Sequence, residues 1–295
     1  MAEEQEKAEA ELKQNPKRRK KHAFPYGNYQ SYYGYRLGQK FVEDPRLKVF
    51  KKEWFEGKDC LDIGCNSGMV TIQIARKFNC RRILGVDIDP DRVDDAYRNL
   101  RRARINVGKP DNGLELGASG ASKIDTEAST SISSSKEHDL HTDVSFQQQN
   151  FIFSQYPPEK HYDTILCLSV AKWIHLNWGD DGLITLFYKI WRLLHPGGIL
   201  VLEPQPWKSY EANYSVSETT KKNFKSIRIL PEEFQEILLD KIGFRTVEAL
   251  TTGLSHSNTG GFNRPIFVFQ KHGKEWLFLK GAVFSGIPVT YANGS

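Results

Sequence analysis

A short glycine-containing turn is the segment of this sequence best suited to hold a ligand. Residues 61–68 read Leu-Asp-Ile-Gly-Cys-Asn-Ser-Gly and stand between an apolar run and a helix-like stretch. Glycine lets the backbone turn tightly and approach a ligand closely, and the first N–H groups of the following helix are available as hydrogen-bond donors. The spacing differs from GxGxxG and from the Walker sequence that ends in Gly-Lys-Ser/Thr, which disfavours a phosphate-binding loop.

An acidic residue follows this turn at the end of the next apolar run. Asp87 stands 23 positions after Gly64. A carboxylate at the end of a second strand can accept hydrogen bonds from both hydroxyl groups of a ribose. Together, the turn and the acid predict a site for a cofactor that contains a nucleoside.

These features resemble the class I S-adenosylmethionine (SAM)-dependent methyltransferases. The resemblance implies SAM as the cofactor and an α/β, Rossmann-like fold, with a mostly parallel seven-stranded sheet and helices on both faces. Asn150 and Phe151 match the place where this family contacts the adenine, the amide at its edge and the aromatic ring against its face. Residues 167–178 lack the Asn/Asp-Pro-Pro-Tyr sequence of base N-methyltransferases, so an exocyclic amine is a less suitable acceptor.

Five stretches narrow the resemblance to the bicoid-interacting, or methylphosphate capping, enzyme family. They lie at residues 26–36, 61–68, 166–182, 202–207 and 261–265, and they include Trp-Ile-His-Leu-Asn-Trp-Gly-Asp from residue 173 and Glu-Pro-Gln-Pro-Trp from residue 203. The resemblance covers about residues 24–271. It implies methylation of the γ-phosphate at the 5′ end of a small noncoding RNA, such as 7SK small nuclear RNA.

The resemblance also assigns residues to the cofactor. It implies that Tyr33 and Arg46 meet the methionine carboxylate, that the turn contacts the methionine part through its backbone, and that Asp87 binds the ribose. For Cys65 and Leu168, plain packing is an equal alternative. The complete set expected at the cofactor is Tyr33, Arg46, Gly64, Cys65, Asn66, Asp87, Ile88, Asn150, Phe151 and Leu168, and no metal is expected.

A second set of residues is assigned to the acceptor phosphate: Tyr32, Arg36, Lys172, His175 and Arg264. Cations and hydroxyl groups orient phosphate, and the acceptor oxygen is already anionic near neutral pH, so positioning matters more than a strong general base. Alternatives stay open for each residue. Lys172 and Arg264 could be surface charges, His175 a hydrogen-bonded loop residue, and Tyr32 and Arg36 packing groups over the cofactor.

Three further residues near this set have structural interpretations. Trp173 and Trp178 fit core or cavity-wall positions better than platforms on which RNA bases stack. Glu203 is either a structural residue or one that holds Lys172 in place.

The elements that must position these residues alternate between strands and helices. We expect strands at residues 60–64, 82–88, 144–151, 162–168, 198–203, 244–250 and 266–270, and helices at residues 68–78, 90–104, 181–194 and 231–241. Such alternation favours a mostly parallel sheet with helices on both faces. Ligands of such sheets bind at the carboxyl ends of the strands.

Composition sets the expected domain limits. The chain has 295 residues, of which 39% are hydrophobic, enough to bury a substantial core. We expect one methyltransferase domain at residues 23–272, a charged flexible tail at residues 1–22 and a C-terminal tail at residues 273–295. Residues 109–145 hold three Lys or Arg, seven Asp or Glu and eight Ser, which predicts a disordered acidic insertion within the domain.

Charge and hydropathy bear on location and partners. The net charge is +5, and because residues 1–22 contribute +2 and residues 109–145 contribute −4, the remainder carries +7, which suits a polyanionic partner. The basic run at residues 17–21 is a nuclear import signal, an RNA contact or a solvated charge run. No segment resembles a membrane span or a secretory signal, and the four cysteines show no paired spacing. We expect a soluble nuclear monomer with reduced thiols, bound to the 5′ end of an RNA and associated with ribonucleoprotein proteins.

Three other functions are compatible with this sequence. One is methylation of an RNA 5′-monophosphate by the same family. Another is a small-molecule or RNA-nucleoside methyltransferase, because the fold does not fix the acceptor; the residues from Lys172 to Trp178 argue against it. The last is an RNA-binding scaffold or chaperone, which the intact turn at Gly64 and the acid at Asp87 disfavour.

Overall fold

The computed structural model describes residues 24–29, 43–105, 144–250 and 264–273. The expected tail at residues 1–22, most of the expected insertion at residues 109–145 and all but one residue of the expected tail at residues 273–295 lie outside the described residues. The carboxyl end of the insertion was placed too late, because Val144 and Ser145 already pair within the sheet.

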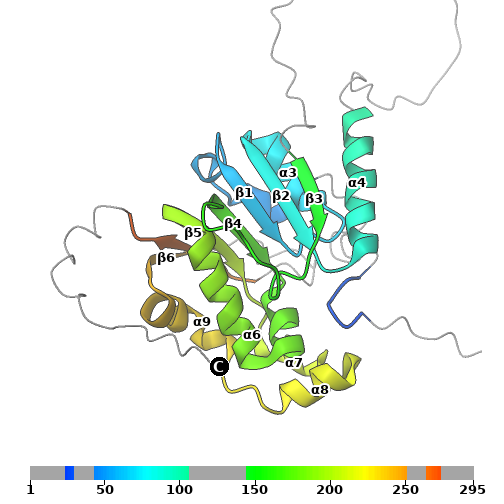
Figure 1. Cartoon of the computed structure of the whole chain (residues 1–295), viewed down its shortest axis with the longest axis vertical. Helices are drawn as coiled ribbons and strands as arrows, with labels where there is room; N and C mark the ends of the chain where they lie inside the picture. The colour runs from blue at the N-terminus through cyan, green and yellow to red at the C-terminus, as the bar shows by residue number, and fades with distance from the viewer. Residues whose placement is uncertain (1–23, 30–42, 106–143, 251–263, 274–295) are drawn as a thin grey trace, which may run out of the picture.

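Seven strands form one sheet within the described residues, in the order β3-β2-β1-β4-β5-β7-β6 (Figure 1). The neighbours from β3 to β5 pair in parallel, whereas β7 runs antiparallel to both β5 and β6. The predicted mostly parallel sheet is therefore confirmed. The strands are β1 (Asp59–Ile63), β2 (Arg82–Asp87), β3 (Val144–Gln148), β4 (Tyr162–Leu168), β5 (Leu194–Glu203), β6 (Phe244–Leu250) and β7 (Ile266–Lys271).

Helices cover both faces of the sheet, which explains why the inner strands are nearly continuous apolar runs. One buried cluster joins the sheet to α3 (Met69–Phe78) and α4 (Pro90–Ile105), and a second joins it to α6 (Ala171–Leu193) and α9 (Phe234–Glu236). The prediction of helices on both faces is confirmed. Among the described helices, none has the length and apolar character that a bilayer crossing requires.

Residues 171–178 are helical, so the predicted start of the helix at Asp181 was wrong. α6 begins at Ala171, and Gly179, with φ +65° and ψ −165°, interrupts it between two helical parts. Most side chains of the first part are buried, from Ala171 through Leu176. A helix that is buried around most of its circumference shows no alternation of apolar and polar faces, which removed the signal that the prediction used.

The segment between β5 and β6 contains helices that the sequence did not predict. α7 (Trp207–Glu211) and α8 (Glu218–Phe224) are too short for a periodic pattern, and Figure 1 shows them beside one end of α6. The helix expected at residues 231–241 consists of three consecutive short segments, η5 (Pro231–Glu233), α9 and η6 (Ile237–Ile242). The other short helical segments are η1 (Pro45–Lys48), η2 (Lys52–Trp54) and η4 (Tyr214–Val216).

The strand order reverses between β1 and β4. The chain places β2 and β3 on one side of β1, then returns to place β4 and β5 on the other side. A reversal of this kind opens a crevice at the carboxyl ends of the strands, because the connecting segments on either side lead in opposite directions. The ligand site is therefore expected at the ends of β1, β2 and β4.

Candidate active site

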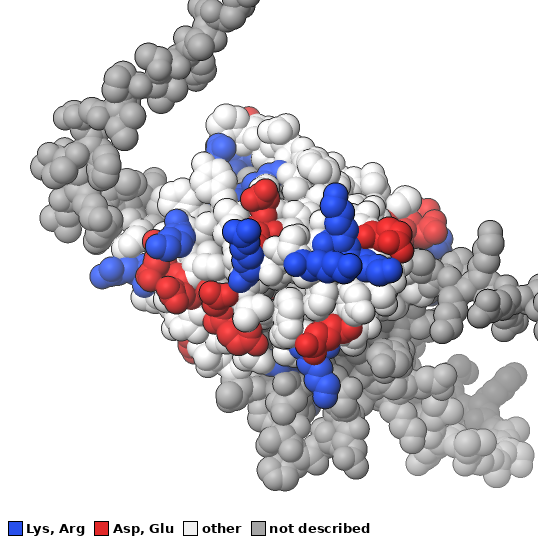
Figure 2. Space-filling view, turned by 90° about the horizontal axis from the view of Figure 1, so that it is seen from below, with Lys and Arg blue, Asp and Glu red and all other residues white. Residues whose placement is uncertain are grey.

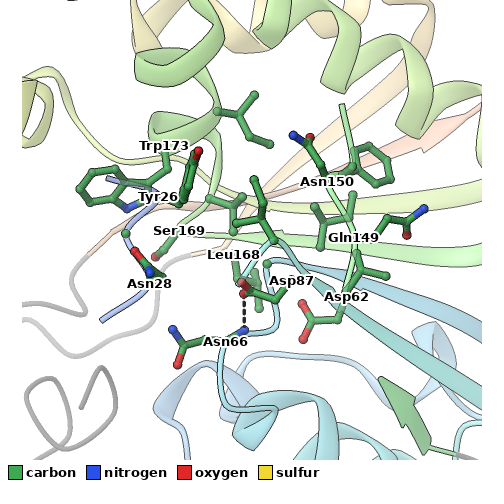
Figure 3. A pocket seen from close by; sticks show the side chains of 18 of the residues that line it. Tyr26, Asn28, Asp62, Asn66, Asp87, Gln149, Asn150, Leu168, Ser169 and Trp173 are labelled. Atoms are coloured by element: carbon green, nitrogen blue, oxygen red, sulfur yellow. Dashed lines mark hydrogen bonds between the residues drawn. The ribbon is translucent and has the colours of Figure 1, made fainter. Parts of the chain in front are cut away.

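A cavity lies at the carboxyl ends of β1, β2 and β4, where the strand order reverses (Figure 3). Cys65, which was expected to bind the cofactor, is a buried core residue outside the cavity lining, and Tyr33 lies outside the described residues. The other residues of the expected cofactor set all line the cavity: Arg46, Gly64, Asn66, Asp87, Ile88, Asn150, Phe151 and Leu168.

The turn after β1 exposes its backbone to the cavity. Gly64 has φ +72°, and its N–H donates to the carbonyl of Val86 at 2.7 Å. A Cβ atom at Gly64 would lie 2.3 Å from Cγ2 of Val170, so a side chain has no room there. The turn also needs the left-handed conformation that glycine adopts without strain. Glycine is therefore required at this position for both conformation and space.

Asp87 presents a buried carboxylate at the end of β2. Its Oδ2 accepts from the N–H of Asn66 at 2.9 Å, the bond drawn in Figure 3, and its Oδ1 accepts from the N–H of Asp89 at 3.0 Å. Burial raises the pKa of Asp87, and these two N–H donors oppose the rise. Each carboxylate oxygen can accept a further hydrogen bond, so Asp87 is equipped to bind two hydroxyl groups of a ligand.

Asp62 is a cavity residue that the sequence analysis quoted within the turn but did not assign. Its side chain is almost fully buried, and Oδ2 accepts a hydrogen bond from the hydroxyl group of Thr71 at 2.6 Å. Burial raises the pKa of Asp62 to about 6, although Thr71 and the positive charge of Arg46 act in the opposite direction. A buried carboxylate beside the cavity favours a ligand that carries a positive charge.

The segment after β3 forms one side of the cavity. Asn150 accepts a hydrogen bond at Oδ1 from the N–H of Ile152 at 3.1 Å, and the ring of Phe151 is buried. Gln149 and Ile152 also line the cavity and were not predicted. Figure 3 shows Asn150 and Gln149 across the cavity from Trp173. This placement agrees with the expectation that Asn150 and Phe151 lie beside an adenine, which stays a prediction.

Residues 24–29 pass along the opposite side of the cavity. Gly27 packs so closely on Trp173 that a Cβ atom would lie 2.1 Å from Nε1 of the indole. The side-chain amide of Asn28 donates to the carboxylate of Asp89, two residues after the end of β2. This segment of the chain thus connects the two sides of the cavity. Gly27 belongs to one of the stretches that resemble the family, and its close packing on Trp173 gives a physical reason for glycine at this position.

Both tryptophans line the cavity, as the wall interpretation predicts. Trp173 is 7% exposed, and Trp178 stacks on Tyr26 with 6.0 Å between ring centroids. Phe153, 67% exposed, meets Trp178 edge to face. The rim of the cavity is therefore aromatic.

A buried polar network lies at the ends of β4 and β5. Arg46 donates to both carboxylate oxygens of Asp44 at 2.8–2.9 Å and to Oε2 of Glu203 at 2.8 Å. The same Oε2 accepts from the hydroxyl group of Ser169 at 2.7 Å, and that hydroxyl oxygen accepts from Nη1 of Arg264 at 3.1 Å. Arg46 and Ser169 both line the cavity. The network therefore links the cavity lining to Arg264. Glu203 has a structural role, which is one of the two alternatives that the sequence left open.

Lys172 was assigned to the acceptor phosphate, but its side chain lies outside the cavity lining. It is 4% exposed, its Nζ donates to the hydroxyl group of Ser209 at 3.0 Å, and it lies 4.1 Å from the ring centroid of Trp173. Lys172 therefore stands behind a cavity wall and joins it to α7.

His175 was assigned to the same phosphate, and it too lies outside the lining. It is fully buried in α6, with Nε2 at 2.7 Å from Oδ1 of Asp180 and Nδ1 at 3.2 Å from the hydroxyl oxygen of Tyr210. Burial lowers the pKa of His175, and Asp180 opposes that effect. The structure does not bring His175 to the cavity. Tyr32 and Arg36 lie outside the described residues.

Comparison with known families identifies two matches along the chain. The Bicoid-interacting protein 3 family matches residues 162–271, and a methyltransferase domain matches residues 61–200. These ranges contain the turn, Asp87, the ends of β4 and β5, and Arg264. The matched residues therefore include most of the cavity.

Related proteins cover most of this chain. The protein named probable RNA methyltransferase of Arabidopsis thaliana is 57% identical, with 86% of this chain and 83% of the relative aligned. The U6 snRNA methylphosphate capping enzyme of Drosophila melanogaster is 34% identical, over 88% of this chain and 79% of the relative. The human 7SK snRNA methylphosphate capping enzyme is 38% identical over 84% of this chain, which spans only 39% of that relative's length.

A solved structure supports the fold assignment. An O-methyltransferase family protein from Burkholderia thailandensis superimposes with a TM-score of 0.50 at 12% identity, over 82% of this chain and 58% of that one. The chain thus contains a class I methyltransferase domain, and SAM is its methyl donor.

The cavity residues fit SAM. The turn at Gly64 has no room for a Cβ atom and presents backbone to the cavity, Asp87 can accept from two hydroxyl groups, and Asp62 complements a cation. SAM carries an ammonium group, a sulfonium group and a ribose, so each of these features has a partner in the cofactor.

Proposed function

Since the chain belongs to the Bicoid-interacting protein 3 family, we propose that it is an RNA methyltransferase that transfers a methyl group from SAM to the γ-phosphate at the 5′ end of a small noncoding RNA. The observation that carries this proposal is the cavity itself. Its cofactor side is formed by the turn at Gly64 and by Asp87, while its other side is formed by the segments at residues 169–178 and 24–29 that resemble the capping enzymes.

The proposed reaction is a direct displacement. When bound, SAM supplies an electrophilic methyl group on a positively charged sulfur. Gly64 and Asp87 fix the cofactor, and Asp62 is positioned to meet its ammonium group. A phosphate oxygen attacks without prior loss of a proton near neutral pH, so the protein contributes mainly alignment and exclusion of water.

The residues around the acceptor act in two ways. We propose that Arg264, whose Nη1 bonds to Ser169 at the cavity lining, contacts the triphosphate together with Tyr32 and Arg36. Lys172 and His175 are better assigned to positioning, because neither side chain is part of the cavity lining. Lys172 bonds to Ser209 of α7, and His175 contacts Asp180 and Tyr210. A buried histidine with a lowered pKa is also poorly placed to be a cationic phosphate ligand.

The proposal extends to location and partners. Named relatives act on small nuclear RNAs, which supports a nuclear protein that binds an RNA 5′ end. The basic run at residues 17–21 suits nuclear import. We also propose that the protein is a monomer and that ribonucleoprotein proteins are further partners.

The test is to incubate the protein with radiolabelled SAM and one RNA sequence that carries a 5′ triphosphate, a 5′ monophosphate or a 5′ hydroxyl group. Nuclease digestion then locates the label. We expect label on the terminal phosphate of the triphosphate RNA. Label confined to the monophosphate RNA would show that the acceptor is a 5′ monophosphate and not the γ-phosphate. A 5′-monophosphate acceptor appears in the name of another relative. Binding of SAM without label on any of the RNAs would contradict the proposal.

A further inference from the structure

The short helices between β5 and β6 carry a group of exposed cations that the proposed function does not use. Residues 207–230 contain five Lys or Arg and two Asp or Glu, a net charge of +3. We call the five cations the α8 basic patch. Figure 2 views this side of the molecule and shows Lys and Arg side chains gathered near the middle of the face, among a few carboxylates. All five are exposed: Lys208, Lys221, Lys222, Lys225 and Arg228.

The patch has fewer carboxylate partners than basic residues at the opposite end of the sheet. Arg81 and Arg82 both form ion pairs with Asp59, at 2.7 and 2.9 Å. Within the patch, Lys221 lies 3.9 Å from a carboxylate oxygen of the exposed Glu218, and the described residues give the other four cations no ion pair. Unpaired surface cations remain fully available to an external anion.

The patch is rigidly connected to the wall of the cavity. Phe224 of α8 stacks on Trp207 at 5.0 Å between centroids, and Trp207 stacks on Tyr210 at 5.2 Å. Tyr210 packs in one buried cluster with Trp173, which lines the cavity. Asn223 also donates its side-chain amide to the carbonyl of Leu176 in α6 at 3.0 Å. The patch therefore keeps a fixed position relative to the bound 5′ end.

We propose that the α8 basic patch binds the phosphate backbone of the RNA downstream of the 5′ end that enters the cavity. This inference rests on the proposed function and adds a second contact surface for the same substrate. Lysine is a flexible point charge without a planar fork, so such contacts hold RNA irrespective of sequence. The patch raises affinity for long RNA and contributes nothing to the methylation of a substrate too short to reach it.

The experiment compares two matched double variants of the full chain, K222Q/K225Q in the patch and K241Q/R245Q on exposed residues of η6 and β6. Each removes two positive charges. Affinity is measured for a long single-stranded RNA with a 5′ triphosphate over a series of salt concentrations, and methylation is measured for that RNA and for a triphosphorylated dinucleotide. Thermal unfolding and SAM affinity show that each variant is folded.

We expect K222Q/K225Q to weaken binding of the long RNA by about tenfold at physiological salt and to reduce the logarithmic salt slope by about 1.4, since each phosphate contact to a single strand contributes about 0.7. Methylation of the dinucleotide is unchanged, and K241Q/R245Q resembles the unmodified protein. Equal RNA affinity in the two double variants would overturn the inference while leaving the proposed function intact. Absence of methylation in the unmodified protein would instead refute the proposed function.

Discussion

The cofactor side and the acceptor side of the cavity are built by different means. The cofactor side consists of turns whose shape is set locally: Gly64 adopts a left-handed conformation, and Asp87 binds N–H groups a few residues away or across one strand pair. The proposed acceptor side consists of contacts between distant segments, such as the bonds that join Glu203, Ser169 and Arg264. Local geometry leaves a readable sequence pattern, whereas contacts between distant segments do not.

The largest expected effect comes from adding one methyl group to the cofactor turn. G64A places Cβ 2.3 Å from Val170 at a residue with φ +72°. Left-handed strain and overpacking against Val170 together cost about 3 kcal/mol in the native turn. The turn relieves this cost by moving away from the position that holds SAM, so we expect SAM to bind about 100-fold more weakly by calorimetry. The control is G57A, whose φ is +65° with no atom within 4 Å of the new Cβ. It should lower the melting temperature and leave SAM affinity unchanged; equal losses in both variants would show that strain alone explains the effect.

Removal of the Asp87 carboxylate should have the next largest effect. D87A deletes the acceptor of two backbone N–H groups and the proposed ribose contact. Hydrogen bonds to a charged group contribute about 1.5–3 kcal/mol, so SAM affinity should fall about 10- to 100-fold. D87N, which keeps one acceptor oxygen, should fall between D87A and the unmodified protein. An unchanged SAM affinity in D87A would remove Asp87 from the cofactor site.

The titration of Asp62 predicts a pH dependence of cofactor binding. Its pKa in the folded protein is about 6, so at pH 5 roughly one protein in ten carries the anion. Because the ammonium group of SAM favours the anion, SAM affinity should be about tenfold lower at pH 5 than at pH 7. D62N should flatten this profile, and a D62N profile identical to that of the unmodified protein would exclude Asp62 as its cause.

The carboxyl group of Asp62 also makes the free energy of unfolding depend on pH, but in the opposite direction: a higher pH favours SAM binding and destabilises the SAM-free fold. Its folded pKa of about 6 lies above the usual 3.8, so the folded state holds the proton more tightly than the unfolded state. The stabilisation is present below about pH 4 and is lost as the pH rises through about 6, a change of about 3 kcal/mol by proton linkage. Denaturant unfolding of the SAM-free protein at pH 4 to 7 should show this loss relative to D62N. Parallel stability curves for the two proteins would contradict it.

The smallest expected effect lies on the acceptor side. K172A removes the bond to Ser209 and the cation from the face of Trp173, interactions that together contribute about 2 to 5 kcal/mol to the folded state. Because Lys172 acts on the cavity only through its wall, we expect about 1 kcal/mol of this to reach the reaction. We expect turnover on triphosphate RNA to fall about fivefold, with little change in SAM affinity. K172M, which retains much of the side-chain packing, separates lost charge from lost volume. Unchanged turnover in K172A would remove Lys172 from the acceptor side.

The sequence predicted the sheet and several residues that line the cavity, because both leave local patterns in the chain. The apolar runs of β1, β2 and β4 and the glycine spacing of the turn were sufficient to place Gly64 and Asp87 at one edge of a parallel sheet. Asp62 could have been identified as well, since a carboxylate inside an apolar run is costly to bury without a purpose. For Cys65 the packing alternative fits the structure, since the side chain belongs to a buried core cluster and lies outside the cavity lining.

The acceptor side could not be predicted in the same way. Lys172 and His175 lie on a helical segment that is buried on nearly every side, so its residue pattern does not indicate which face meets the cavity. The partners of these residues, Ser209 and Tyr210, come from a short helix more than 30 positions away in the chain. The family resemblance located the segment correctly but could not orient its side chains.

The most direct test of the two-sided site is to measure SAM affinity and RNA affinity on the same two variants, D87A and R264A. We predict that D87A weakens SAM binding and leaves binding of triphosphate RNA unchanged. R264A, which loses the cation that contacts Ser169 but retains the pair of Arg46 with Glu203, should weaken RNA binding and leave SAM binding unchanged. If R264A weakened SAM binding as strongly as RNA binding, the division of the cavity into a cofactor side and an acceptor side would be contradicted.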